Sequence, residues 1–174
     1  MWSPDRRRAV AVLAAVGASL ALGGCFRPLY GELSNGRSMA GELAAIQVDD
    51  IGDRLGHYLR NELIFLLDGS GQTAVKRYRL AVTPSVSVIT AIVDSATARA
   101  DSASLSGTAT FVLTRLDNGQ EIFRGTTRGS ATYDRSVQRY ATVRAARDAE
   151  IRLGKLFAEQ IRTQIAAALA GRSS

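Results

Sequence analysis

The stretch "SLSGTATFVLTRLDNGQEIFRGTTRGSAT", Ser104–Thr132, predicts a β-hairpin. Before the turn, apolar side chains alternate with serine and threonine; they are Leu105, Ala109, Phe111 and Leu113. A period of two is typical of a strand with one covered face. The dipeptide Asn118-Gly119 follows, and it tolerates the positive φ angles of a tight hairpin turn. The return strand is predicted over about Glu121–Thr132.

A short strand and a helix are predicted between Ala44 and Gly69. Ala44–Val48 predicts the strand, and Asp53 is expected to be the N-cap of the helix. Leucines at i, i+4 spacing indicate one buried helix face; they are Leu55, Leu59, Leu63 and Leu66 or Leu67. Gly69 is expected to stop this helix.

A further strand is predicted from Val75, where apolar and polar residues alternate again. It is expected to continue past Pro84 to about Val93. Because proline cannot donate a hydrogen bond to a strand ladder, Pro84 indicates an edge position or a bulge. Residues 94–101 predict a polar loop.

A long amphipathic helix is predicted over Val137–Ala170. Its apolar stripe consists of Ala146, Ala149, Leu153, Leu156, Phe157, Ile161, Ile165 and Leu169. We interpret this stripe as core that packs on the sheet, with a partner surface as the alternative. Gly171 is expected to end the helix and to leave residues 172–174 as a tail.

The predicted order is therefore strand, helix, three strands, helix (β-α-β-β-β-α). The simplest packing of these elements is an α+β two-layer sandwich, in which two amphipathic helices cover one face of a four-stranded sheet. Residues 43–171 have a length that suits a single domain with one core.

The first 24 residues predict a lipoprotein signal peptide, which is removed. Arg6–Arg8 is followed by the uncharged run Ala9–Leu22, which is shorter than the roughly 20 residues that a membrane-spanning helix needs. Leu22-Gly23-Gly24-Cys25 matches the bacterial lipobox, so cleavage is expected between Gly24 and Cys25. The alternative is an ordinary signal peptide with an incidental cysteine.

Lipidation accounts for the single cysteine of the chain. Cys25 is expected to carry diacylglycerol and an N-acyl chain, and about two chains already give stable anchoring in a membrane. Residues 25–42, rich in Gly and Ser, are expected to form a lipid-anchored tether. Phe26 stands where an aspartate usually retains lipoproteins in the inner membrane, and this favours the outer membrane, at its periplasmic face.

The chain carries a formal net charge of +6. Three arginines and one aspartate of this total lie in the predicted signal peptide. Basic residues recur on the predicted strands and their loops; among them are Lys76, Arg77, Arg79, Arg99, Arg115, Arg124 and Arg128. Solvated sheet edges explain them without function. The alternative is contact with an anionic amphiphile that carries phosphates, which suits arginine forks. Nucleic acid is not an expected partner of an exported lipoprotein.

Nothing in the sequence predicts a catalytic site, a metal site or a cofactor. His57 is the only histidine, which excludes a metal site built from a histidine cluster. Asp49-Asp50-Ile51-Gly52-Asp53 has the spacing of a magnesium diphosphate motif, but it more simply ends a strand and caps a helix. No glycine-rich phosphate loop is present, and we therefore predict that the protein is not an enzyme.

The segment after the lipobox cysteine, Phe26-Arg27-Pro28-Leu29-Tyr30-Gly31, resembles the start of the LPS-assembly lipoproteins of the LptE family, alphaproteobacterial type. In that family the cysteine is commonly followed by Gly-Phe-x-Pro-Leu-Tyr-Gly; here a glycine precedes the cysteine instead. Further matches are Arg54-Leu55-Gly56, Leu59–Leu63, the strand Tyr78-x-Leu80-x-Val82, and Tyr133 through Tyr140-Ala141 into an alanine-rich helix.

This resemblance implies a fold like the one expected above and a non-enzymatic role. LptE proteins partner the LptD β-barrel of the outer membrane as plug and assembly factor, and they bind lipopolysaccharide. By charge and topology, the candidate lipopolysaccharide-binding residues are Lys76, Arg77, Arg79 and Arg99. Two other classes remain open: an auxiliary lipoprotein of an ABC-type lipid transporter, and a lipid-anchored hydrolase that uses His57.

Overall fold

The structure is a computed structural model, and it describes residues 36–69, 74–90 and 102–172. The elements are α2 (Met39–Ala44), β1 (Ile46–Val48), α3 (Asp53–Leu67), β2 (Tyr78–Ile89), β3 (Ser102–Arg115), β4 (Glu121–Asp134) and α4 (Arg139–Arg172). The α+β class, the four-stranded sheet and the two long helices that pack on it are confirmed.

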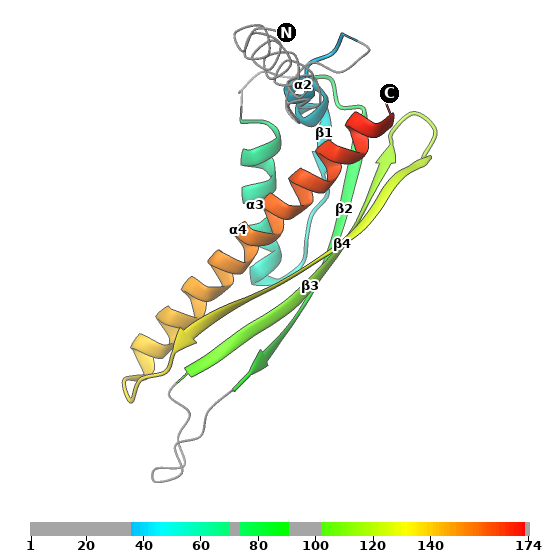
Figure 1. The fold of residues 1–174 in the computed structure, drawn as a ribbon. Helices are drawn as coiled ribbons and strands as arrows, with labels where there is room; N and C mark the ends of the chain where they lie inside the picture. The colour runs from blue at the N-terminus through cyan, green and yellow to red at the C-terminus, as the bar shows by residue number, and fades with distance from the viewer. Residues whose placement is uncertain (1–35, 70–73, 91–101, 173–174) are drawn as a thin grey trace, which may run out of the picture.

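The sheet has the strand order β1-β2-β3-β4 (Figure 1). β1 is parallel to β2, and helix α3 makes the crossover between them. The other two pairings are antiparallel, so β2, β3 and β4 form a meander. Gly119 has a φ of 68° in the turn between β3 and β4, as the Asn-Gly signal predicts.

The core lies between the inner face of the sheet and the two long helices. Residues of β3 alternate between buried and less buried positions along its length, which confirms the strand with one covered face. The interpretation of the α4 stripe as core is confirmed from Ala149 onward: Leu153, Phe157, Ile161 and Ile165 are each 0% exposed. Ala146 and Leu156 are half-buried at the margins of the stripe.

The ring of Phe157 lies over two glycines of the sheet. Gly107 and Gly129 are direct partners in the β3–β4 register. A Cβ atom on either would lie 3.3–3.4 Å from the Phe157 ring, and on Gly129 also 2.6 Å from a methyl group of Leu156. The absence of side chains at these two positions therefore lets α4 approach the sheet closely.

Helices α3 and α4 are joined by polar contacts as well as by leucines. The Arg54 guanidinium donates two hydrogen bonds to the Glu150 carboxylate, at 2.6 and 2.5 Å. Arg147 Nε donates to the Tyr58 hydroxyl at 2.6 Å, and its guanidinium also lies over the Tyr58 ring. These contacts link the two helices at their exposed side.

Pro84 lies on the open edge of β2. Leu80 O accepts from Asp49 N at 3.0 Å, so the even-numbered residues of β2 direct their backbone groups toward the β1 side. β1 pairs only with Tyr78–Leu80, and none of the described strands lies opposite Pro84 on that side. The predicted edge position is confirmed. The predicted strand end near Val93 and the loop 94–101 lie outside the described residues.

Four boundaries differ from the sequence expectation. Residues 39–42 are not extended but belong to α2, in which Met39 and Leu43 are buried, and the predicted strand starts at Ile46 instead of Ala44. Gly52, not Asp53, is the N-cap of α3; Asp53 begins the helix with a φ of 67° and makes no capping hydrogen bond. Helix α4 continues through Gly171 to Arg172, since helical backbone accommodates glycine at some cost.

Candidate functional site

A basic cleft opens at the end of the sheet where β2 begins and β3 ends. Its volume is about 490 Å³, and its lining residues are Arg37, Lys76, Arg77, Tyr78, Arg115, Leu116 and Asp117. Four of these seven residues are cationic and one is acidic, so the lining alone favours an anion. Arg37 lines the cleft, so the first described residues of the chain lie at this end of the domain, beside α2 (Figure 1).

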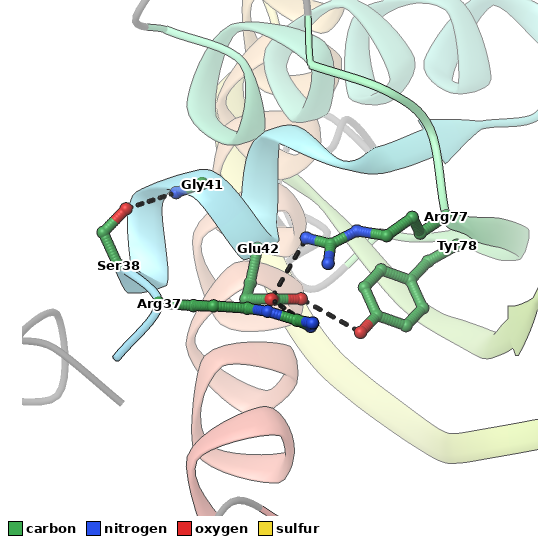
Figure 2. Close-up of polar contacts among 6 residues, drawn as sticks. All are labelled: Arg37, Ser38, Gly41, Glu42, Arg77 and Tyr78. Atoms are coloured by element: carbon green, nitrogen blue, oxygen red, sulfur yellow. Dashed lines mark hydrogen bonds and ion pairs between the residues drawn. The ribbon is translucent and has the colours of Figure 1, made fainter. Parts of the chain in front are cut away.

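Glu42 of α2 contacts three residues that line the cleft, Arg37, Arg77 and Tyr78 (Figure 2). Its side chain is 3% exposed, and its Oε1 lies 3.2 Å from Arg37 Nη1 and 3.0 Å from Arg77 Nη2. Its Oε2 accepts a hydrogen bond from the Tyr78 hydroxyl at 3.0 Å. A buried carboxylate requires such partners, because burying an unpaired charge is costly. Two arginines share one carboxylate here, which leaves this cluster with a net positive charge.

Tyr78 links the carboxylate to the rest of the cleft. Burial, followed by the hydrogen bond to Glu42, raises the pKa of its hydroxyl above the usual range for tyrosine. The positive charges of Arg77 and Arg115 act in the opposite direction on the same pKa. At neutral pH the hydroxyl is therefore protonated and donates to Glu42. The Arg77 guanidinium lies 5.8 Å from the centre of the Tyr78 ring, within the range of a cation–π contact.

Lys76 has a structural role at the back of the cleft. Its Nζ donates to the Ala44 carbonyl at 2.7 Å and to Asp68 Oδ2 at 3.2 Å. These bonds join the end of α2 to the end of α3. The charge of Lys76 is thus already neutralised by a carboxylate within the domain.

Arg115 differs from the other basic residues of the cleft. It is the direct partner of Tyr78 across the β2–β3 register, on the inner face of the sheet. Its Nε is buried and has no hydrogen-bond partner. Among the described residues, no carboxylate forms an ion pair with its guanidinium. Arg115 therefore brings to the cleft a positive charge that the domain does not neutralise.

The structure separates the four predicted lipopolysaccharide-binding residues. Lys76 and Arg77 lie at the cleft. Arg79 is outside the cleft lining, and its Nε contacts both carboxylate oxygens of Asp49 at 2.9 and 2.8 Å. Arg99 lies outside the described residues, as do Gly24, Cys25 and the segment Phe26–Gly31.

Sequence reasoning missed Arg37 and Glu42 and treated Arg115 as one basic residue among several. Arg37 and Glu42 fall in the segment that was expected to be a tether. The available signal was a short helix start: Ser38 accepts from the Gly41 amide at 3.1 Å, and Glu42 follows in the first turn. Arg115 immediately precedes the hairpin turn, but its opposition to Tyr78 depends on the strand register.

The other residues considered for catalysis or metal binding, His57, Asp49 and Asp50, contact neighbouring side chains of the domain. His57 is exposed on α3, with Nε2 3.1 Å from the Asn61 side-chain amide. Asp49 pairs with Arg79, and Asp50 pairs with Arg60. The described parts of the chain contain no cluster of three or more acidic, histidine or cysteine side chains that could hold a metal ion. No helix within these parts is long and apolar enough to cross a membrane.

Comparison with protein families identifies the chain. The family model described as LptE, lipopolysaccharide-assembly, matches residues 43–165. The chain belongs to the LptE family. No match is found among curated proteins. The matched LptE region includes α3, the whole sheet and most of α4, while Arg37 and Glu42 precede it.

Solved structures share the LptE fold. A lipoprotein from Caulobacter crescentus CB15 is similar with a TM-score of 0.63 and 28% identity, covering 76% of this chain and 96% of the other. The rare lipoprotein B from Shewanella oneidensis is similar with a TM-score of 0.57 and 13% identity, covering 74% and 97%. The protein is therefore an LPS-assembly lipoprotein of the LptE family with the fold of these relatives.

Proposed function

We propose that this protein is a non-enzymatic outer-membrane lipoprotein that partners an LptD-type β-barrel, as plug and assembly factor, in lipopolysaccharide transport to the cell surface. The observation that carries the proposal is the LptE family match over residues 43–165. The protein is also proposed to bind lipopolysaccharide. It needs no cofactor for this role, because binding and scaffolding require no chemical step.

The lipid anchor at Cys25 is part of the proposal. Eleven residues separate Cys25 from Arg37, and an extended chain spans at most about 3.3–3.6 Å per residue. The described domain thus begins within roughly 40 Å of the anchored cysteine. At the periplasmic face of the outer membrane, the cleft end of the domain is then the end that this short segment joins to the anchor.

Cys25→Ala tests the anchor. Without the thiol no thioether can form, so we expect complete loss of acylation and an uncut precursor that retains residues 1–24. Metabolic labelling with a palmitate analogue and intact-mass measurement check both points. Ser34→Ala, a substitution in the same segment away from the lipobox, is the control and should be processed normally. A normally processed and acylated Cys25→Ala protein would contradict the assignment.

Co-purification tests the barrel partner and lipopolysaccharide together. The native lipoprotein, tagged at its C-terminus and extracted from envelopes in mild detergent, is expected to recover a large β-barrel that runs faster unheated than heated on electrophoresis. Lipopolysaccharide is expected in the same fraction and is measured by its characteristic sugar acid.

The alternative partners give a different result in the same experiment. Recovery of inner-membrane transporter subunits, with fractionation of the lipoprotein to the inner membrane, would replace the proposal with an auxiliary role at an ABC-type lipid transporter. If His57→Ala abolished the function of the protein in cells, the result would support the hypothesis of a lipid-anchored hydrolase instead. The exposed position of His57, beside Asn61, is the reason we expect no such effect.

Lys76, Arg77, Arg79 and Arg99 remain the proposed lipopolysaccharide-binding residues. The ion pairs of Lys76 and Arg79 with Asp68 and Asp49 reduce the charge that either can offer to a ligand. Arg77 is the best placed of those described, because it lines the cleft and shares Glu42 with a second arginine.

A further inference from the structure

We infer that the basic cleft is a phosphate-binding site in which Arg115 is the central ligand and Arg37 and Arg77 are flanking donors positioned by Glu42. The inference deepens the proposed function, and it rests on that function only for the membrane as one source of the phosphate. The ligand chemistry itself follows from the cleft.

The first step is the state of Arg115. A guanidinium carries five N–H donors and stays charged at all physiological pH values. The Nε of Arg115 is buried without a partner, although buried polar groups are nearly always hydrogen-bonded. Among the described residues its charge has no carboxylate partner, while it lies opposite Tyr78 at the cleft wall. A bound anion at the cleft would neutralise this charge.

The second step is the arrangement of the two flanking arginines. Arg37 and Arg77 each direct one terminal nitrogen at Oε1 of Glu42 (Figure 2). Their side chains are 58% and 38% exposed, so part of each guanidinium faces the cleft and solvent. Glu42 is anchored in turn by Tyr78 and is almost fully buried. It therefore restricts both side chains and lowers the entropy cost of ligand binding.

The third step concerns the kind of anion. Three guanidinium forks line one opening: Arg37 shortly before α2, Arg77 immediately before β2, and Arg115 at the end of β3. Planar forks suit the oxygens of phosphate, which accept several charge-assisted hydrogen bonds at once. The cleft volume of about 490 Å³ accommodates a phosphate together with part of a headgroup. Asp117 is the only acidic residue in the lining, and it is exposed.

Two kinds of phosphate source are compatible with this site: a lipid headgroup of the membrane, lipopolysaccharide included, and free inorganic phosphate. The first probe is inorganic phosphate, titrated by calorimetry against the full-length lipidated protein in a neutral detergent. The second probe is phosphatidic acid in phosphatidylcholine nanodiscs that carry the anchored protein, followed by phosphorus-31 NMR. Nanodiscs of phosphatidylcholine alone are the blank.

Three variants make the test specific to the cleft. Arg115→Gln is expected to weaken phosphate binding about ten- to a hundredfold, because it removes charge-assisted hydrogen bonds. Arg115→Lys keeps the charge but not the fork and should recover part of the affinity. Arg128→Gln is the matched control: Arg128 lies on β4 outside the cleft lining, and among the described residues it has no ion-pair partner either. Circular dichroism confirms that each variant is folded.

The possible results distinguish whether the cleft binds phosphate and which source supplies it. Phosphate binding that depends on Arg115 supports the inference, and an Arg115-dependent shift of the phosphatidic acid signal identifies the headgroup as the source. Binding of inorganic phosphate without that shift supports the site with free phosphate as its ligand. No saturable binding of either probe, or equal loss in Arg115→Gln and Arg128→Gln, overturns it. Recovery of the barrel is measured in a separate experiment on the native protein, so failure here leaves the proposed barrel partnership standing, and failure to recover the barrel leaves the phosphate site standing.

Discussion

Phe157→Ala is expected to lower the free energy of unfolding by about 3–5 kcal/mol, the range for removing a buried phenylalanine. The ring is 0% exposed. The cost should fall near the upper end of that range, since cavity collapse is limited. Gly107 and Gly129 below the ring have no side chains that could move into the space.

Urea denaturation followed by circular dichroism measures this change. Phe65→Ala is the matched control, because Phe65 lies on α3 with 70% of its surface exposed. The same substitution there should change the free energy of unfolding by less than about 1 kcal/mol. Equal effects of the two variants would mean that α4 does not pack on the glycine pair as the structure shows.

Gly125→Ala is expected to lower the free energy of unfolding by about 1–3 kcal/mol, although it adds only one methyl group. A Cβ atom at Gly125 would lie 2.5 Å from a ring carbon of Phe111 and 2.8 Å from the Gln164 side-chain oxygen. Gln164 can rotate away, but Phe111 is 0% exposed and has little room to move. Relief therefore requires the Phe111 ring of β3 or the β4 backbone beside it to shift within the packed core.

Gly171→Ala is the matched control for this substitution. Nothing lies within 4 Å of a Cβ atom at Gly171, which sits in the last turn of α4. Alanine is the better helix former, so a change between zero and about 1 kcal/mol in favour of the folded state is expected. Thermal melts of the two variants should move in opposite directions. A Gly125→Ala protein as stable as the native chain would contradict the packing of the Phe111 ring against Gly125.

The elements that the sequence predicts well are those with a long, regular period. The meander of β2, β3 and β4 follows from alternation and one Asn-Gly turn, and the α4 stripe follows from a pattern repeated over many turns. Helix α2 could not be predicted in this way, because six residues give less than two turns of pattern. Its buried face depends on contacts that only the tertiary fold supplies. The N-cap of α3 shows the same limit. Whether Gly52 or Asp53 occupies this position depends on the backbone angles of single residues, which a sequence pattern does not give.

The cleft was only partly predictable. Arg77 was identified from charge, but its partner Glu42 lies 35 positions earlier in the chain. Arg115 becomes distinctive only when the register places it opposite Tyr78. Local pattern carries no information about which carboxylate neutralises which arginine. For this reason Lys76 and Arg79 were expected to be as available as Arg77, whereas each has a carboxylate partner within the domain.

The 34-residue helix α4 gives the domain its long dimension. At about 1.5 Å per residue it measures roughly 50 Å, which exceeds the roughly 30 Å thickness of a bilayer's hydrocarbon core. Its C-terminal turn lies at the cleft end, where Arg172 donates to the Ile122 carbonyl, and its first turn lies at the opposite end. With the proposed anchor on the side of the cleft, the opposite end of α4 therefore lies farther from the cleft end than the hydrocarbon core of a membrane is thick.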